Sequence, residues 1–397
     1  MKKALWISLS LVMLGVVGAI SFKLFEPVFT YRVGWSSLPQ GAGLTGETVD
    51  PQWTKQSAVA EDALKTGRDN TNAPALSAAL SIDGRLVWRG AIGMADVERR
   101  LKADFDTRFR IGSTSKAVTA VGVGVLIDSG KLKLEQPIAS FPHAVTLGQV
   151  MSHRAGIRNY GLCLCFPVWE HQNQRRFRNI NEQVAVVKNS PLLFKPGTDF
   201  AYTSLGYNLT GTAIEQASGE PFGTYMNNAV FQPLGMKRTS LSETGAARFY
   251  ETEPGRYKRA FAVDNSIRWP SGAMLSTPSD MVALGNVMLD DRLLTAATRK
   301  LLLSIPTEGR TGDGRTYAYG WRHSGWTLYN GKLKLDSYHH NGTAVGSTSI
   351  FVVLPEKRIA LSLMMNKGGE DVADLSAVAD QILQAFIDLP LVTKADF

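Results

Sequence analysis

The feature that most constrains this chain is an apolar run from Ala117 to Ile127 that directly follows Ser113-Thr114-Ser115-Lys116. The run contains no charged residue and stops shortly before Gly130, a pattern that predicts a buried helix. Because residues three apart share one face of a helix, we expect the Ser113 hydroxyl and the Lys116 amine to lie side by side. Such a pair indicates either a capped helix with a surface lysine or a serine nucleophile with a lysine base.

A serine nucleophile with a lysine base requires particular surroundings for both side chains. A serine hydroxyl is inert at its ordinary pKa and needs a neighbouring group that takes its proton. A lysine can be that group only if burial or nearby cations lower the pKa of its amine. The start of a helix would also offer backbone N–H groups to an oxyanion. Serine and lysine at this spacing are common by chance, so other motifs must decide between the two interpretations of the pair.

A second motif, Tyr202-Thr203-Ser204, follows a turn signal at Pro196-Gly197 and precedes a helical pattern over residues 205–217. A tyrosine in such a loop can present its phenol to the serine and the lysine, and can relay a proton to the leaving group. The alternative is a tyrosine that only packs the loop.

A third motif, His340-Asn341-Gly342-Thr343, leads into two β-rich runs at residues 347–354 and 358–365. The two runs flank a Pro-containing turn and predict a hairpin. A cation at His340 could bind a substrate carboxylate, and the Thr343 N–H could donate to an oxyanion. The alternative is a surface pair formed by His339 and His340.

In this order, the three motifs resemble those of the serine β-lactamase-like family. That family includes class C β-lactamases, penicillin-binding D-Ala-D-Ala peptidases and related esterases. Ser113 matches its acylated serine, Lys116 its lysine and Tyr202 the tyrosine of its Y-x-N element. His340-Asn341-Gly342 matches its K-T-G element, and the resemblance covers roughly residues 57–390.

Further segments resemble the same family. Residues 150–157 are similar to its L-L-S-H-x-S-G-L segment, and residues 231–236 to its F-x-P-L-G-M segment. Residues 263–266 and 275–277 resemble the branch that contains the mitochondrial serine β-lactamase-like protein. The resemblance implies a serine hydrolase without metal or cofactor that forms an acyl-enzyme. It also implies peptide substrates, including D-Ala-D-Ala stems, or carboxylic esters.

The resemblance assigns catalysis to Ser113, Lys116 and Tyr202, and substrate binding to Ser204, His340, Asn341, Gly342 and Thr343. Two of these positions depart from the family. Ser204 stands where asparagine is usual, and His340, which titrates near pH 6.5, stands where lysine is usual. Both departures disfavour efficient β-lactam hydrolysis. A true β-lactamase and an idle, membrane-tethered binding module remain the alternatives.

The fold implied is α/β, an antiparallel sheet flanked by helices with a mainly helical lobe beside it. Alternating patterns predict hairpins over residues 76–93, turning at Asp83-Gly84, and over residues 347–365. An amphipathic pattern over residues 372–387 predicts a helix that packs on the sheet. We expect the domain to span residues 57–397. Its α/β lobe would comprise about residues 57–112 and 320–397, and its helical lobe about residues 113–319.

The N-terminus looks like a targeting segment. Lys2-Lys3 precede an apolar stretch from Ala4 to Phe22, which predicts a signal peptide or a membrane anchor over residues 1–23. Either would export the body, to the periplasm or to the outer side of a membrane. Residues 24–56 hold several prolines and glycines and predict a linker.

Charge and cysteine content limit the partners. A net charge of +8 suits an anionic membrane surface or a cell-wall polymer such as peptidoglycan, and is weak support for nucleic acid.

The two cysteines, Cys163 and Cys165, make no disulfide framework and lack zinc-site companions, so we expect plain thiols. Residues 309–316 approach a P-loop but lack its lysine, so we expect a surface loop.

Overall fold

An antiparallel sheet organises the chain. The computed structural model describes residues 2–39, 43–161, 169–369 and 372–387. The strands of the main sheet are, in spatial order, β10 (Arg322–Leu328), β11 (Leu333–Ala344), β12 (Ser347–Leu354), β13 (Ile359–Met365), β3 (Ala75–Ile82), β4 (Arg85–Asp96) and β2 (Leu44–Thr48), with β5 (Leu101–Lys102) paired to β4. Every pairing is antiparallel, as the hairpin patterns predicted.

Both predicted hairpins are confirmed. Asp83 and Gly84, at φ 51° and 76°, join β3 to β4, and left-handed residues at both central positions match the twist of the strands they join. A short 3-10 turn at Pro355–Lys357 joins β12 to β13. All residues of β12 are buried, because helices cover both faces of the sheet at this point.

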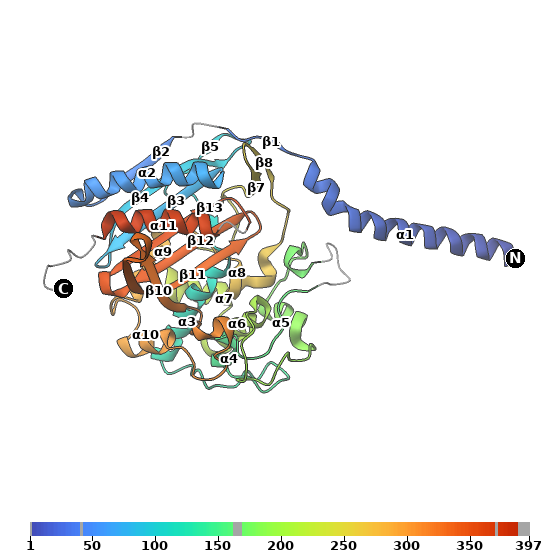
Figure 1. Ribbon diagram of the computed structural model, residues 1–397. Helices are drawn as coiled ribbons and strands as arrows, with labels where there is room; N and C mark the ends of the chain where they lie inside the picture. Colours follow the sequence, from blue (N-terminus) through green and yellow to red (C-terminus); the bar gives the residue numbers. More distant parts are fainter. Residues whose placement is uncertain (1, 40–42, 162–168, 370–371, 388–397) are drawn as a thin grey trace.

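On one face of the sheet, α2 (Thr54–Thr71) and α11 (Val372–Phe386) lie side by side (Figure 1). The predicted C-terminal amphipathic helix is therefore confirmed. On the other face, α9 (Pro278–Val287) packs against β13 and β3. α9 falls within residues 113–319, the approximate range predicted for the helical lobe, yet its buried apolar side chains cover the second face of the sheet.

The helical lobe surrounds α3 (Ser115–Asp128), which is buried without interruption from Ser115 to Gly124. Its other helices are α4 (Leu147–Met151), α5 (Ile180–Lys188), α6 (Ser204–Ser218), α7 (Phe222–Met226), α8 (Trp269–Gly272) and α10 (Ala296–Leu303). The buried helix predicted from the apolar run is confirmed. Two short sheets complete the body, one of β1 (Ser36–Ser37), β8 (Arg256–Arg259) and β7 (Tyr250–Glu253), the other of β6 (Phe109–Arg110) and β9 (Leu275–Ser276).

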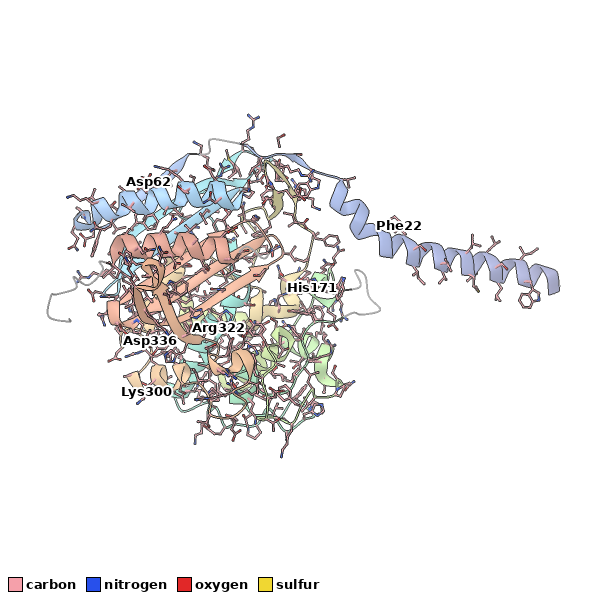
Figure 2. The ribbon with its side chains drawn as sticks, in the orientation of Figure 1. Phe22, Asp62, His171, Lys300, Arg322 and Asp336 are labelled. Carbon is pink, nitrogen blue, oxygen red and sulfur yellow. The ribbon has the colours of Figure 1, made fainter. Side chains whose placement is uncertain are left out.

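The N-terminal helix α1 (Lys2–Arg32) projects away from the body, and its apolar side chains from Trp6 to Phe22 are exposed (Figures 1 and 2). Within the four described ranges, no helix combines the length and the apolar character needed to cross a bilayer.

The predicted linker over residues 24–56 differs from the structure. Residues up to Arg32 continue α1, β1 pairs with β8, and β2 pairs along β4 over Leu44–Thr48. The reason is that β4 would otherwise present unpaired backbone groups at the edge of the sheet. Residues 309–316 form an irregular, mostly exposed loop with a short 3-10 turn, as predicted. Cys163 and Cys165 lie outside the described residues.

Candidate active site

The turn before α3 sets the position of Ser113. A 3-10 turn over Gly112–Thr114 precedes the helix, and Gly112 adopts φ 51°, a conformation that suits glycine. Ser113 is partly exposed, whereas Ile111, Gly112 and Thr114 around it are buried. The hydroxyl of Ser113 therefore faces an accessible space while its backbone is held by the core. The Nζ of Lys116, in the first turn of α3, lies 3.4 Å from its Oγ.

Lys116 is fully buried, and its other contacts show how its amine can act as a base. Nζ donates to the Ser271 carbonyl at 2.8 Å and lies 3.0 Å from the Ser204 Oγ. Burial, and then the positive charge of Arg268, hold the pKa of Lys116 well below its usual range. A neutral amine has two N–H groups and one lone pair. With both N–H groups directed at Ser271 and Ser204, the lone pair is left for the Ser113 hydroxyl.

Tyr202 lies in the loop immediately before α6, where the Thr203 side chain caps the helix by accepting from the Gly206 N–H. Its side chain is hydrogen-bonded to Ser113, and its ring centroid lies 4.8 Å from Lys116 Nζ. Burial raises the pKa of Tyr202, an effect that the bond to Ser113 only partly offsets. The side chain is therefore a neutral phenol at neutral pH and can donate a proton.

The ring of His153 packs against the ring of Tyr202. The two ring centroids are 4.3 Å apart, and His153 Nδ1 accepts a hydrogen bond from the Thr203 N–H at 3.3 Å. His153 is buried at φ 59°. Residues 150–157, which include His153, stand out in the sequence only through their resemblance to the family, and that resemblance assigned His153 no role.

His340 lies on β11 and is buried, 2% exposed. Its Nδ1 is 2.7 Å from the Asn341 carbonyl oxygen, which can only accept, so Nδ1 carries the proton. Its Nε2 then accepts from the Tyr317 hydroxyl at 3.0 Å. Burial holds the pKa of His340 well below its usual range. A buried imidazole with both nitrogens engaged stays neutral, so His340 does not supply the cation that could bind a substrate carboxylate.

The rest of the third motif packs directly on the turn that holds Ser113. A Cβ atom at Gly342 would lie 1.9 Å from the Ile111 carbonyl oxygen, and one at Gly112 would lie 2.9 Å from the Thr343 nitrogen. The backbones of Thr343 and Ser113 therefore lie on neighbouring segments, as two oxyanion donors would require. Asn341 Oδ1 is buried, with no hydrogen-bond partner among the described residues.

Ser204, at the start of α6, is buried beside Lys116. Its backbone N–H donates to Asn159 Oδ1 at 3.0 Å. The structure thus brings Ser113, Lys116, Tyr202 and Ser204 together, with the end of β11 beside them. Sequence reasoning missed Tyr317 and Ser271, because a buried tyrosine and a backbone carbonyl leave no local pattern.

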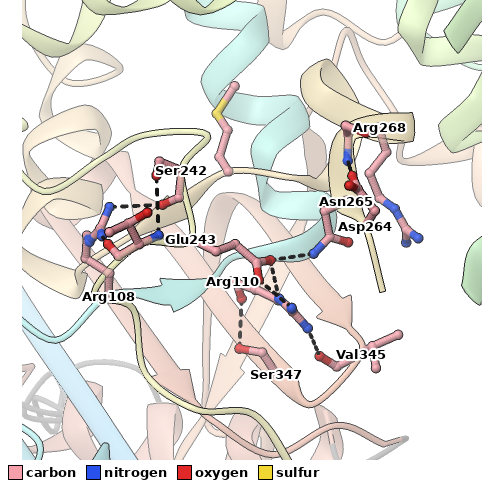
Figure 3. Close-up of polar contacts among 12 residues, drawn as sticks. Arg108, Arg110, Ser242, Glu243, Asp264, Asn265, Arg268, Val345 and Ser347 are labelled. Atoms are coloured by element: carbon pink, nitrogen blue, oxygen red, sulfur yellow. Dashed lines mark hydrogen bonds and ion pairs between the residues drawn. The ribbon is translucent and has the colours of Figure 1, made fainter. Parts of the chain in front are cut away.

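A polar network braces the turn that follows Thr343 (Figure 3). The Arg110 guanidinium makes two bonds of 2.7 Å to Glu243 and donates to the Val345 carbonyl at 2.7 Å. Asn265 Nδ2 donates to Glu243 at 2.7 Å, and Ser347 Oγ donates to the Arg110 carbonyl at 2.8 Å. The network therefore ties β6, β12 and the loop around Glu243 to the β11–β12 turn. In the four described ranges, no group of three His, Cys, Asp or Glu side chains is placed to hold a metal ion.

Comparison with known proteins agrees with this arrangement. The family model described as Beta-lactamase matches residues 60–384. The chain belongs to the beta-lactamase family. It is 28% identical over 402 residues to the mitochondrial serine beta-lactamase-like protein of Bos taurus, covering 76% of this chain and 72% of that protein. It is 26% identical to penicillin-binding protein 4 of Amycolatopsis lactamdurans, covering 77% of this chain and 84% of that protein.

The solved structures bear out the fold. D-amino acid amidase from Ochrobactrum anthropi superposes with a TM-score of 0.68 at 22% identity, covering 82% of this chain and 98% of that one. The predicted family resemblance and the β-lactamase-like fold are thus confirmed, and the chain is a serine hydrolase of this family.

Proposed function

We propose that this protein hydrolyses peptides, including D-Ala-D-Ala stems, or carboxylic esters through an acyl-enzyme on Ser113. The observation that carries the proposal is the buried Lys116 amine, whose Nζ lies 3.4 Å from the Ser113 Oγ, 3.0 Å from the Ser204 Oγ and 2.8 Å from the Ser271 carbonyl oxygen. An amine in that state can accept the proton of the hydroxyl as Oγ attacks the substrate carbonyl carbon.

The remaining steps follow from the neighbouring groups. The Ser113 and Thr343 N–H groups would hold the oxyanion of the tetrahedral intermediate. The Tyr202 phenol would give its proton to the leaving group as the carbonyl–leaving group bond breaks, and would regain a proton from Lys116. Water would then attack the acyl-enzyme ester and release the acid. The neutral His340 and the serine at position 204 make efficient β-lactam hydrolysis the weaker alternative.

We also propose that the catalytic body works outside the cytoplasm, in the periplasm or attached to a membrane by its N-terminal segment. Support comes from Lys2-Lys3, the apolar stretch from Ala4 to Phe22, and the exposed side chains of α1. The net charge of +8 suits an anionic surface such as a membrane or peptidoglycan.

The nucleophile can be tested by intact-mass spectrometry after incubation with a fluorophosphonate. We expect one label on the wild type, one on Ser115→Ala and none on Ser113→Ala. Ser115 is the matched control, because it lies two residues away and its Oγ accepts from the Met274 N–H instead. Turnover of an ester and peptide panel should be lost with the label in Ser113→Ala. A label that persists in Ser113→Ala would overturn the assignment, and a wild type with neither label nor turnover would favour the idle binding module.

A further inference from the structure

A cavity of about 920 Å³ lies between the β4–β5 turn, the loop before β7 and the end of β8. These elements lie together at the top of the body in Figure 1. The described residues that line the cavity do not include Ser113, Lys116, Tyr202 or His340, so it is separate from the active site. Its volume suits a small organic molecule, because ligand pockets typically measure about 300–1,000 Å³.

Three basic side chains of this cavity are gathered by one stretch of β4. The Arg248 N–H donates to the Ala95 carbonyl at 2.7 Å, and the Arg99 N–H donates to Asp96 Oδ1 at 2.9 Å. Lys102, on β5, pairs with the residue that precedes Ala95. Three consecutive positions of β4 therefore hold these segments, and the side chains of all three basic residues line the cavity.

The charges of the three side chains are poorly balanced. Arg248 approaches Asp96 only at 3.5 Å, and its side chain is 58% exposed. Arg99 and Lys102 are exposed, and no acidic side chain in the described part of the chain forms an ion pair with either. The other acidic side chains of the cavity are engaged elsewhere: Glu243 with Arg110, Asp106 with Arg238, and Asp104 with the Thr107 hydroxyl.

Apolar side chains stand beside these cations. Leu101, next to Lys102 on β5, is 45% exposed, and Phe249 and Phe261 line the same cavity. A leucine so exposed gains little from packing within the body. A ligand with a small carbon skeleton and several anionic groups would cover Leu101 and neutralise the cations, whereas a simple inorganic ion would do only the second.

One wall of the cavity is shared with the active site (Figure 3). Arg110 and Glu243 both line the cavity, and the Arg110 guanidinium donates to the Val345 carbonyl at 2.7 Å. Val345 lies two residues beyond Thr343, and Arg110 lies three residues before Ser113. An anion in the cavity adds negative charge near Glu243, which weakens the hold of that carboxylate on Arg110 and disturbs both proposed oxyanion donors.

We propose that this cavity binds a small organic anion with two or more carboxylate or phosphate groups, through Arg99, Lys102 and Arg248. Its binding slows acylation of Ser113 by weakening the pair of Arg110 with Glu243. The binding site goes beyond the proposed function and does not depend on it. Only the effect on acylation relies on Ser113 as the nucleophile.

Calorimetric titration of the full-length protein in an uncharged detergent tests the site, with citrate as a polycarboxylate and pyrophosphate as a phosphate. We expect at least one of the two to bind, more weakly at higher salt, and acetate to bind poorly. Arg99→Gln and Arg248→Gln should each raise its Kd by roughly 5- to 20-fold, because each removes a charged contact. Arg100→Gln is the matched control, because Arg100 is exposed in the same turn but is not among the residues that line the cavity.

Asp96→Asn tests the same site by a gain of affinity. The substitution removes the carboxylate that competes for Arg248, whereas an asparagine Oδ1 can still accept the Arg99 N–H. We expect the Kd of the bound anion to fall by about two- to fivefold at low salt.

The effect on Ser113 is measured as the rate of fluorophosphonate labelling with and without a saturating anion. We expect the anion to slow labelling of the wild type by about three- to tenfold, and to have less effect on Arg248→Gln at the same concentration. The fluorophosphonate is uncharged, so the anion does not compete with it for a cation.

Two results would overturn the site. One is no binding of citrate or pyrophosphate up to ~5 mM, and the other is equal weakening in Arg100→Gln and Arg248→Gln. Binding that leaves the labelling rate unchanged would overturn the effect on acylation. A wild type that does not label at all contradicts the proposed function, and calorimetry still decides whether the cavity binds the anion.

Discussion

At the scale of single residues, the site depends on a lysine that is buried with no acidic partner in contact among the residues that the structure describes. Burial of an ammonium group is costly, so the amine gives up its proton instead. Its two serine neighbours and the Ser271 carbonyl then fix the direction of its lone pair. The same physical rule applies to His340, where burial keeps the imidazole neutral.

This state of Lys116 predicts the pH dependence of acylation. The amine accepts a proton only when neutral, and its pKa lies well below the ordinary value of a lysine. The kcat/KM of an uncharged ester substrate should therefore be lost as the pH falls through that lowered pKa, and be retained above it. Lys116→Arg stays charged and should react at least ~10³-fold more slowly at every pH.

The wild type and Lys116→Arg are compared by measuring kcat/KM from pH 5 to pH 10. Lys131→Arg, an exposed lysine just after α3, is the control and should follow the wild type. An activity that appears only near the ordinary pKa of lysine would show that Lys116 is a cation at neutral pH, contrary to this account. His340 should add no second inflection between pH 5.5 and pH 8, since its pKa lies well below 6.5.

At the scale of elements, the site is formed where β11 meets the turn before α3. The contact needs glycine on both sides, and it is reinforced by the Ser349 Oγ, which donates to the Ile111 carbonyl at 2.9 Å. The Thr114 Oγ1 also bonds to the His340 carbonyl at 3.2 Å. Sheet and helical lobe therefore meet here through closely approaching backbone segments, with two hydroxyl side chains bonded to backbone carbonyls across the junction.

Gly342→Ala should disturb this junction. Its Cβ would stand 1.9 Å from the Ile111 carbonyl oxygen, so the strand and the nucleophile turn must move apart. We expect destabilisation of about 1–3 kcal/mol and a loss of about 100-fold in the fluorophosphonate labelling rate. Thermal unfolding and labelling kinetics measure the two effects. Gly43→Ala is the control, because its Cβ would meet only Lys102 Nζ at 3.7 Å, and an unchanged Gly342→Ala would contradict the close approach.

At the scale of the whole molecule, α1 differs from the folded body in the exposure of its apolar side chains. Apolar side chains of α1 are exposed, whereas β1 and β2 just after it are paired into the sheets of the body. The folded body therefore begins soon after Arg32, earlier than the residue 56 at which the predicted linker ends.

Two deletions test this boundary. Removal of residues 1–32 should move the protein from the membrane to the soluble fraction and leave kcat/KM for an uncharged ester substrate within about twofold, because no part of the site is lost. Removal of residues 1–49 also removes β2 and should cost about 2–4 kcal/mol of stability, because the edge of β4 loses its ladder. Fractionation and thermal unfolding provide the readouts. A full-length protein that is already soluble in the cytoplasm would contradict the proposed location.

Local patterns in the sequence determined much of this protein. An apolar run without charges specified the buried helix α3, and alternating residues around Asp83-Gly84 specified a hairpin, because each depends only on neighbours along the chain. The spacing of Ser113 and Lys116 was enough to bring the two side chains together for the same reason.

Only the tertiary structure decided the charge states and the long-range partners. The neutral form of His340 depends on Tyr317, 23 residues away, and on burial between two lobes. Lys116 takes its third partner from Ser271, 155 residues away. Desolvation and contacts between distant segments set these properties, and neither leaves a pattern among neighbouring residues.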